Sequence, residues 1–477
     1  MNPVLLGFAG YLIAIFVVGL LTARLNKTID DYLLAGRKLG IWVITFSERA
    51  SGESAWLLLG LPGVVFVSGL SELWVAIGCT SGILFSWIFI SRRLRTESEY
   101  NYAITIPEFF EHKFNDTSRS IRTFATIIIV FFFAFYVSAQ FIGAGKVLNV
   151  SFGLSTFWGM LFGAAIILFY TIMGGFFAVA WTDLFQGALM IATLVILPLV
   201  GLIEIGGWEK MVGHLSQSHR DHLSVLGGHT GIFAAFSIIS GLAWGLGYMG
   251  QPHLLVRFMA VNNPEDLRRG TLIGITWSVV AFWGAIFLGL FALVIFGSGE
   301  VSDAEKIMPM MATRLVPAWL AGILISGAIA AMMSTADSQL LVTTSAVVRD
   351  IYHNLINRKA SDRRLVSLSR VITFVVGILA IIIALVSQEL VFTMVGFAWS
   401  GLGAAFGPAM LLTLWWRKTT REGVLAGMVV GTVTAIIWHF TPQLSGLVYE
   451  LAPSYILALI AVWLVSLVTA PENHRAG

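Results

Sequence analysis

The sequence has few charged residues: Asp, Glu, Lys and Arg together make up 12% of its 477 residues, whereas 57% are hydrophobic. The mean hydropathy is +0.86. A soluble globular protein of this length carries more charge and less apolar surface. The composition therefore excludes a soluble fold. It predicts an all-α polytopic membrane protein in which residues 1–477 form a single transmembrane domain.

Features of several other protein classes are also missing. The single cysteine, Cys79, excludes an intramolecular disulfide and a cysteine-based metal cluster. The first residues, MNPVLLGF, lack a positive leader, so we expect the first apolar run to remain as a helix. Neither H-E-x-x-H nor G-x-S-x-G occurs, so we predict that the protein is not an enzyme.

Apolar runs long enough to cross about 30 Å of hydrocarbon fill most of the chain. They lie near residues 3–23, 39–67, 70–91, 121–149, 154–172, 175–205, 230–256, 270–297, 316–347, 365–387, 389–415, 423–440 and 447–469. Length and composition locate these runs, because most are apolar nearly all round. We therefore predict about thirteen transmembrane helices.

The basic residues are divided unequally between the loops. Twenty-three of the 29 Lys and Arg residues lie in one alternating set of loops, which includes Arg257, and five lie in the other. The remaining one, Arg49, lies inside a span. Because cytoplasmic loops carry the excess of Lys and Arg, we predict an amino terminus outside and a carboxyl terminus in the cytoplasm. The expected location is the plasma (inner) membrane.

The second span, within Trp42–Pro62, contains charged residues in the middle of an apolar stretch. Glu48, Arg49 and Glu53 lie within six residues of each other. A charge facing lipid there costs roughly 3 kcal/mol, so these side chains must face protein, water or a ligand. We interpret the stretch as a helix interrupted at about Ala50–Glu53. The alternative is a kink with a private salt bridge between Arg49 and Glu53.

The seventh span carries a second interruption, in GLAWGLGYMGQPHLLVRFMA at 241–260, where several glycines precede Pro252. Two broken spans five apart predict an inverted repeat with a binding site near the midplane. The repeats would cover about 39–205 and 230–415, and the spans at 3–23, 423–440 and 447–469 would be peripheral. Trp244, Tyr248 and Gln251 lie at this break and are candidates for a substrate pocket. The alternative is that aromatic residues and glycine–proline kinks here are merely common features of membrane helices.

The ninth span contains the hydroxyl-rich segment AAMMSTADSQLL. Ser334, Asp337 and Ser338 share one helical face, and Thr335 is adjacent. Asp183 lies inside the sixth span, where an acid is a functional candidate by default. A hard monovalent cation takes several oxygen ligands of these kinds. The alternative for each hydroxyl is a bond to its own backbone.

At these residues the chain resembles the sodium/solute symporter family, and most closely its sodium/proline symporter branch. The resemblance covers nearly the whole chain. It is carried by DDYLLAGRKLG from Asp30, SAWLLLGLPGVVFVSGLSE from Ser54, GGFFAVAWTD from Gly174, AWGLGYMGQPHLLVRFMA from Ala243, AAMMSTADSQLL from Ala330 and GLGAAFGPAMLL from Gly401. It implies a LeuT-type five-plus-five inverted repeat and sodium-driven solute uptake.

The resemblance also implies site residues. The main sodium site would use backbone oxygens of Ala50, Glu53 and Ala331 and the hydroxyls of Ser334 and Thr335. A second cation site seen in some members would use Asp183, Asp337 and Ser338. The predicted substrate site comprises Glu53, Trp56, Tyr136, Gln140, Trp244, Tyr248, Gln251 and Pro252.

One stretch departs from the family. Sodium/proline symporters usually read SAGASDMSGW, whereas this chain reads SERASGESAW, which places Gly52 and Glu53 where Asp and Met are usual. The change conserves a carboxylate, replaces sodium by a proton, or alters the substrate. We predict a sodium-coupled symporter of a small organic solute, with an amino acid such as proline expected by analogy. The alternatives are a proton-coupled symporter of the same fold and a solute-sensing membrane protein. No nucleic acid and no obligate protein partner is expected beside the lipid bilayer.

Overall fold

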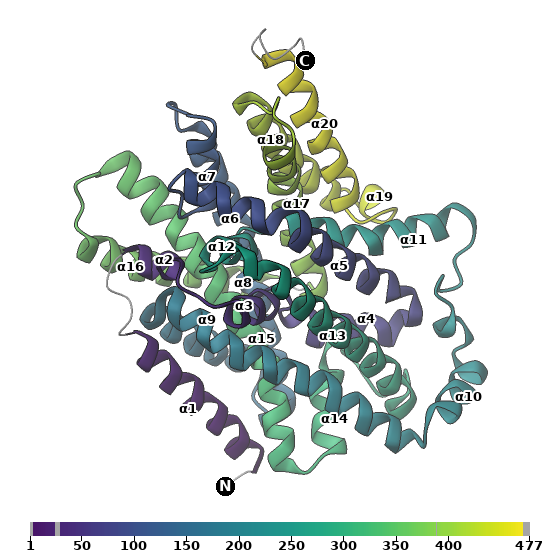
Figure 1. Ribbon diagram of the computed structural model, residues 1–477. Helices are drawn as coiled ribbons and strands as arrows, with labels where there is room; N and C mark the ends of the chain where they lie inside the picture. The colour runs from purple at the N-terminus through teal and green to yellow at the C-terminus, as the bar shows by residue number, and fades with distance from the viewer. Residues whose placement is uncertain (1–2, 24–28, 388, 471–477) are drawn as a thin grey trace.

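The computed structural model describes residues 3–23, 29–387 and 389–470 as a bundle of helices (Figure 1). The α-helices are α1 (Pro3–Ala23), α2 (Ile29–Leu34), α3 (Ile41–Gly52), α4 (Leu61–Ser68), α5 (Leu73–Phe85), α6 (Ser91–Tyr100), α7 (Ile106–Lys113), α8 (Ser120–Phe152), α9 (Thr156–Ile205), α10 (Trp208–Ser218), α11 (Gly231–Ala243), α12 (Pro252–Ala260), α13 (Leu267–Phe296), α14 (Ile307–Leu315), α15 (Ala318–Ser345), α16 (Asp362–Val386), α17 (Val391–Trp415), α18 (Arg421–His439), α19 (Pro442–Ser445) and α20 (Leu451–Thr469). Short 3-10 or π-helical segments are η1 (Ala35–Arg37), η2 (Trp56–Gly60), η3 (Gly69–Glu72), η4 (Ser86–Ile90), η5 (Arg220–Leu223), η6 (Trp244–Met249), η7 (Pro264–Asp266), η8 (Ala304–Lys306) and η9 (Ala346–Ile356). Among the described residues, the β-type pairing is one isolated bridge between Leu39 and Val261. The predicted all-α class is confirmed.

The second span is broken, as its internal charges predicted. α3 ends at Gly52, and Glu53 has φ −105° and ψ 63° before η2 and α4 follow. The backbone N–H of Glu53 still donates to the Arg49 carbonyl at 3.0 Å. The last turn of α3 is therefore intact, and the predicted Ala50–Glu53 interruption is corrected to a break that follows Gly52.

The seventh span is broken where the glycines and the proline predicted. α11 passes into the 3-10 segment η6, and Gln251 adopts an extended conformation with φ −83° and ψ 107°. Pro252 then occupies the start of α12, where a missing backbone N–H costs nothing. α12 continues to Ala260, so the span is longer than the predicted limit of residue 256. This extension places Arg257 inside the helix and corrects its prediction as a loop residue.

The long helix α9 contains a kink that separates the predicted fifth and sixth spans. Gly175 has φ 63° and ψ −178°, a left-handed backbone that residues with a Cβ rarely adopt. The two predicted runs, 154–172 and 175–205, meet at this point.

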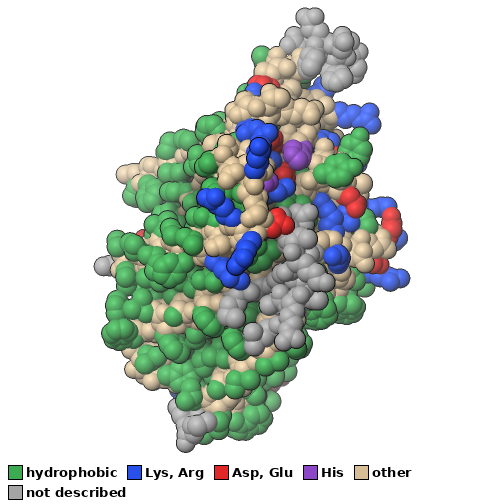
Figure 2. All heavy atoms as spheres, turned by 90° about the vertical axis from the view of Figure 1, so that its left-hand side faces the viewer, with side chains coloured by type: hydrophobic (Ala, Val, Ile, Leu, Met, Phe, Trp, Pro, Cys, Tyr) green, Lys and Arg blue, Asp and Glu red, His purple; other side chains and the backbone are tan. Residues whose placement is uncertain are grey.

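The surface of the molecule is apolar over most of its length. Ten helices within the described residues are long and apolar enough to cross a membrane, and Pro3–Gly19 and Thr156–Ile172 form shorter apolar helices. Figure 2 shows hydrophobic side chains covering the lower part of one face, with Lys and Arg gathered in the upper part. Such extensive exposed apolar surface is typical of lipid contact, and the chain is an integral membrane protein. The exact count of thirteen spans stays a prediction, and the basic residues Arg24, Lys27 and Arg475 lie outside the described residues.

The broken helices lie in the middle of the bundle. α3 packs against α9, α12, α13 and α15, while η6 packs against α5 and α17. Figure 1 shows α3, α12 and α15 near the centre of the view, with α1 and the pair α18 and α20 at its edges. The two interruptions are therefore enclosed by other helices, and their backbone groups are kept away from the molecular surface.

Glycines allow α5 and η6 to touch backbone to backbone. A Cβ added at Gly82 would lie 2.0 Å from the Gly245 carbonyl oxygen, and one added at Gly245 would lie 2.0 Å from the Gly78 carbonyl oxygen. Small residues at such crossings permit the close approach that membrane helices use for packing.

We expect Gly82→Ala to lower stability by about 1–3 kcal/mol, because a backbone carbonyl blocks the added methyl group. The control is Gly213→Ala in α10, where nothing lies within 4 Å of the added Cβ and Ala favours the helix by up to about 1 kcal/mol. Thermal unfolding followed by fluorescence-detected size exclusion measures both variants. Equal melting temperatures for Gly82→Ala and the wild type would contradict this packing.

Candidate functional site

The carbonyl groups at the end of α3 meet hydroxyls from α15. Ser334 Oγ donates to the Ala50 carbonyl at 2.9 Å and to the Ala331 carbonyl at 3.1 Å. Thr335 Oγ1 donates to the Ser51 carbonyl at 3.0 Å. All of these groups are buried. Because α3 stops at Gly52, its last carbonyls need partners from outside the helix, and α15 supplies them.

This oxygen cluster has the chemistry of a sodium site. Carbonyl and hydroxyl oxygens are the ligands that hard cations take, and no thiolate or imidazole is involved. Four of the five residues predicted for the main site, Ala50, Ala331, Ser334 and Thr335, are brought together at the junction of α3 and α15. The fifth, Glu53, whose backbone oxygen was the predicted ligand, follows immediately after α3. Its carboxylate bonds Arg49 and Tyr248.

The charged residues of α3 form a buried cluster around Arg49. Arg49 Nε donates to Glu48 Oε2 at 2.6 Å, and Nη2 also contacts the Glu48 carboxylate. Arg49 Nη1 donates to Glu53 Oε1 at 3.1 Å and to Ser278 Oγ at 3.3 Å. The Trp87 indole donates to Glu48 Oε2 at 3.1 Å. The predicted alternative of an Arg49–Glu53 pair is therefore present in the structure, within a three-charge cluster rather than alone.

Glu53 also connects the two broken helices. The hydroxyl of Tyr248, in η6, donates to Glu53 Oε1 at 2.8 Å, and the Arg49 guanidinium lies 5.4 Å from the centre of the Tyr248 ring. Among the described residues, no hydrogen bond reaches Glu53 Oε2, although this atom is buried. One carboxylate oxygen at the centre of the protein thus remains available to a ligand.

Gln140 of α8 satisfies the far side of the α3 break. Its Oε1 accepts from the Ala55 backbone N–H at 3.0 Å, and its Nε2 donates to Ser54 Oγ at 3.4 Å. The Trp56 indole closes the same turn by donating to the Gly52 carbonyl at 3.1 Å. Gln140 and Trp56 therefore hold the break in shape, and the structure gives them this role beside the predicted substrate contact.

An aromatic layer lies between the centre and an outer cavity. The Trp56 and Trp244 rings stack with centroids 5.0 Å apart, and Trp244 also stacks on Tyr449 at 5.2 Å and contacts Phe392 at 4.8 Å. A cavity of about 560 Å³ is lined by Trp244, Phe392 and Tyr449 together with polar residues that include Glu450. The layer thus separates this cavity from Glu53 and Tyr248.

The remaining predicted substrate residues gather around Trp399 of α17. Gln251 Nε2 donates to the Trp399 carbonyl at 3.0 Å, and the Trp399 ring lies 4.7 Å from Tyr248 and 6.5 Å from Tyr136. Within the part of the chain that the structure describes, Gln251 Oε1 is buried without a hydrogen bond. Pro252 is buried at the start of α12. Trp399 is a central residue that the sequence reasoning missed.

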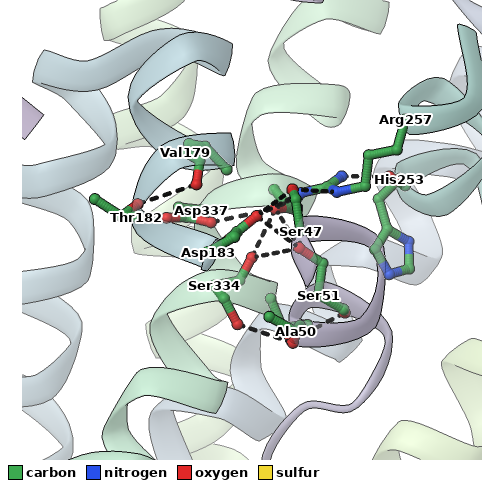
Figure 3. Close-up of polar contacts among 12 residues, drawn as sticks. Ser47, Ala50, Ser51, Val179, Thr182, Asp183, His253, Arg257, Ser334 and Asp337 are labelled. Carbon is green, nitrogen blue, oxygen red and sulfur yellow. Dashed lines mark hydrogen bonds and ion pairs between the residues drawn. The ribbon is translucent and has the colours of Figure 1, made fainter. Parts of the chain in front are cut away.

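The acid of the sixth span meets an arginine that sequence reasoning placed in a loop. Asp183 Oδ2 accepts from Ser47 Oγ at 2.6 Å, from Ser51 Oγ at 3.2 Å and from Arg257 Nη2 at 3.0 Å. Figure 3 shows the Arg257 side chain reaching from α12 toward Ser47, Ser51 and Asp183. Arg257 is 1% exposed. The sequence contained a signal for this position, because Arg257 follows Pro252 by little more than one helical turn. A helix that restarts at Pro252, near the middle of the membrane, is still inside the membrane at Arg257.

The other two residues of the predicted second cation site lie in the same cluster. Ser338 Oγ contacts Ser51 Oγ at 3.0 Å and donates to the Ser334 carbonyl at 2.6 Å. It also contacts Arg257 Nη2. Asp337 is fully buried and accepts a long hydrogen bond from Ser338 Oγ at 3.3 Å. The structure brings Asp183, Asp337 and Ser338 together, with a guanidinium among their oxygens.

A bundle of apolar helices with two central breaks, lined by buried oxygens and charges, defines a membrane transporter. Residues 32–431 match the sodium:solute symporter family. The chain belongs to this family, and it is a sodium-coupled secondary symporter of a small solute.

Individual relatives agree over nearly the whole length. The chain is 38% identical to a sodium/proline symporter of Escherichia coli K12, covering 98% of this chain and 93% of that protein. It is also 38% identical to a high-affinity proline transporter of Bacillus subtilis, covering 96% of each. Among solved structures, a Na+-coupled sialic acid symporter superimposes with a TM-score of 0.80 at 19% identity, covering 99% of each chain. MhsT in complex with L-phenylalanine gives a TM-score of 0.57 at 15% identity, covering 89% of this chain and 97% of that one. These likenesses confirm the predicted LeuT-type fold.

The α3 cluster predicts opposite results for its two charge deletions. Arg49→Gln leaves two buried carboxylates without a cation, and we expect it to lose about 3–5 kcal/mol of stability. Glu53→Gln leaves Arg49 paired with Glu48, so we expect a folded protein. Thermal unfolding of both purified variants measures the difference.

The matched control is Glu265→Gln, which removes a carboxylate that is 69% exposed from an ion pair at the surface. Such pairs contribute roughly 0–1 kcal/mol, so its melting temperature should barely change. A Glu53→Gln protein as unstable as Arg49→Gln would show that Glu53 is needed chiefly to hold Arg49.

Proposed function

We propose that the protein imports proline together with sodium across the plasma (inner) membrane. The observation that carries this proposal is the buried cluster of carbonyl and hydroxyl oxygens where α3 ends against α15. Relatives named as proline transporters, at 38% identity over nearly the whole chain, support the choice of solute. The protein acts by transport and carries no catalytic step.

Sodium binds, in this proposal, to the backbone oxygens of Ala50, Glu53 and Ala331 and to the hydroxyl oxygens of Ser334 and Thr335. The hydroxyls that now donate to carbonyls rotate, so that their lone pairs face the ion. The ion then bridges α3 and α15 in place of the bonds from Ser334 to Ala50 and from Thr335 to Ser51. Sodium binding therefore stabilises one arrangement of these two helices.

The solute binds beside this site, among the predicted residues that surround the two breaks. Proline carries an ammonium group, which would donate a hydrogen bond to the unpartnered carboxylate oxygen of Glu53. Its apolar ring would pack against the aromatic side chains of Trp56, Tyr136, Trp244 and Tyr248. Gln140, Gln251 and Pro252 shape the backbone around them.

Alternating access provides the movement. In this proposal the repeats at about 39–205 and 230–415 rock against each other, with the spans at the two ends of the chain remaining peripheral. The amino terminus lies outside and the carboxyl terminus in the cytoplasm, as the distribution of basic residues favours. The cavity lined by Trp244, Phe392 and Tyr449 then faces outward, and Trp244 lies between it and the rest of the binding site.

Uptake of labelled proline into proteoliposomes tests the proposal. We expect uptake to rise when a sodium gradient is imposed and to stay low with a proton gradient alone. Uptake driven by protons without sodium would replace sodium coupling by proton coupling. Proline binding without uptake under either gradient would favour a solute sensor. Competition by unlabelled amino acids and non-amine solutes tests the choice of proline.

Ser334→Ala and Thr335→Ala each delete one proposed sodium ligand and leave a small side chain. We expect each to raise the sodium concentration for half-maximal uptake on the order of tenfold, which corresponds to roughly 1.4 kcal/mol. The control is Ser326→Ala on the same helix, because Ser326 Oγ bonds to the Gly322 carbonyl of its own helix at 2.7 Å. Unchanged sodium dependence in both ligand variants would count against this site.

A further inference from the structure

Arg257 bonds two of the three residues that the family resemblance assigns to a second cation, Asp183 and Ser338. Its Nη2 atom donates to Ser51 Oγ at 2.7 Å and to Asp183 Oδ2 at 3.0 Å, and it also contacts Ser338 Oγ. Its Nε atom donates to Ser47 Oγ at 2.9 Å. The oxygens come from α3, α9 and α15, and Figure 3 shows the guanidinium entering this group from α12.

These contacts do not fit a second sodium ion. A sodium ion needs oxygen lone pairs directed toward it, whereas here Ser47 Oγ, Ser51 Oγ and Asp183 Oδ2 accept hydrogen bonds from a guanidinium. The guanidinium presents several donors in a fixed plane. Arg257 is 1% exposed, and Asp183 is fully buried. The site therefore already contains a cation, and this cation is covalently part of the chain.

The charges of the neighbourhood lead to the same conclusion. Two acidic residues, Asp183 and Asp337, are buried here, and Arg257 supplies one positive charge. Ser51 connects this group to the proposed main sodium site, because its Oγ lies 3.1 Å from the Ser334 carbonyl and its own carbonyl accepts from Thr335. When both acids are ionised, Arg257 and one sodium ion in the main site balance their charges.

We infer that Arg257 takes the place of a second coupling ion, so that one sodium ion accompanies each solute molecule. The inference rests on the proposed sodium-coupled transport and adds its stoichiometry. Removing the guanidinium leaves two buried acids and a group of oxygens able to bind an ion. The variant Arg257→Gln is therefore expected to need a second sodium ion.

The experiment measures sodium in two ways on purified full-length protein. Equilibrium binding of radioactive sodium counts the ions bound per chain. Paired fluxes of radioactive sodium and labelled proline in proteoliposomes give the transport ratio. We expect about one ion per chain and a Hill coefficient of about 1 for the wild type, and values approaching about 2 for Arg257→Gln, since the Hill coefficient is limited by the number of coupled sites.

Three variants separate the role of the charge from its other effects. Arg257→Lys keeps a fixed cation and should still bind one ion. Arg257→Gln combined with Asp183→Asn removes one acid together with the arginine and should return to one ion. Arg269→Gln deletes an arginine that is 83% exposed and should behave as the wild type.

Two sodium ions bound per wild-type chain would overturn the inference, even if Arg257→Gln fails to fold. Unchanged ion binding and an unchanged Hill coefficient in a folded Arg257→Gln would also overturn it. One ion bound per wild-type chain, without any sodium-driven proline uptake, would support the inference on ion number and contradict the proposed transport. The binding measurement therefore distinguishes the two failures.

Discussion

A helix that ends inside a membrane protein must find partners for its last carbonyl groups, and the centre of this structure depends on that requirement. Water cannot supply these partners at the middle of a bilayer. Ser334, Thr335 and the Trp56 indole bond the carbonyls of Ala50, Ser51 and Gly52 respectively. The bonds from α15 fix its position against α3. The hydroxyls of Ser334 and Thr335, which satisfy this helix end, are also two of the proposed sodium ligands.

Each broken span also carries an arginine beside its break. Arg49 lies in the last turn of α3 between two glutamates, and Arg257 lies in α12 among hydroxyls and Asp183. A buried charge is tolerated only when it is paired and its remaining hydrogen-bonding groups are satisfied. Arg257 has partners on α3, α9 and α15. Arg49 pairs with two glutamates of its own span and reaches α13 through Ser278. The centre of the bundle therefore contains two kinds of polar group: the backbone groups freed at the breaks and the charged side chains of the two arginines.

The sequence predicted what depends on neighbouring residues and missed what depends on distant ones. Both breaks arise from local glycines, prolines and charges, and the structure has both. The predicted boundary between the fifth and sixth spans falls at the kink at Gly175. The contact between Arg257 and Asp183 joins residues 74 positions apart. An arginine that follows an apolar run reads as the start of a loop, because nothing in the local pattern shows that α12 continues to Ala260. The direction of the Glu53 side chain depends on Tyr248 in another helix, so it too required the folded chain.

The glycine contact between α5 and η6 restricts how these two elements can move relative to each other. At this contact the two backbones touch directly, without side chains that could change rotamer. They lie so close that neighbouring backbone atoms block one helix from sliding along the other. This contact therefore resists sliding of α5 along η6 in the seventh span. A bend within that span would occur at Gly250 and Gln251, where η6 has ended and α12 has not yet begun, because the helical hydrogen-bond pattern is interrupted there.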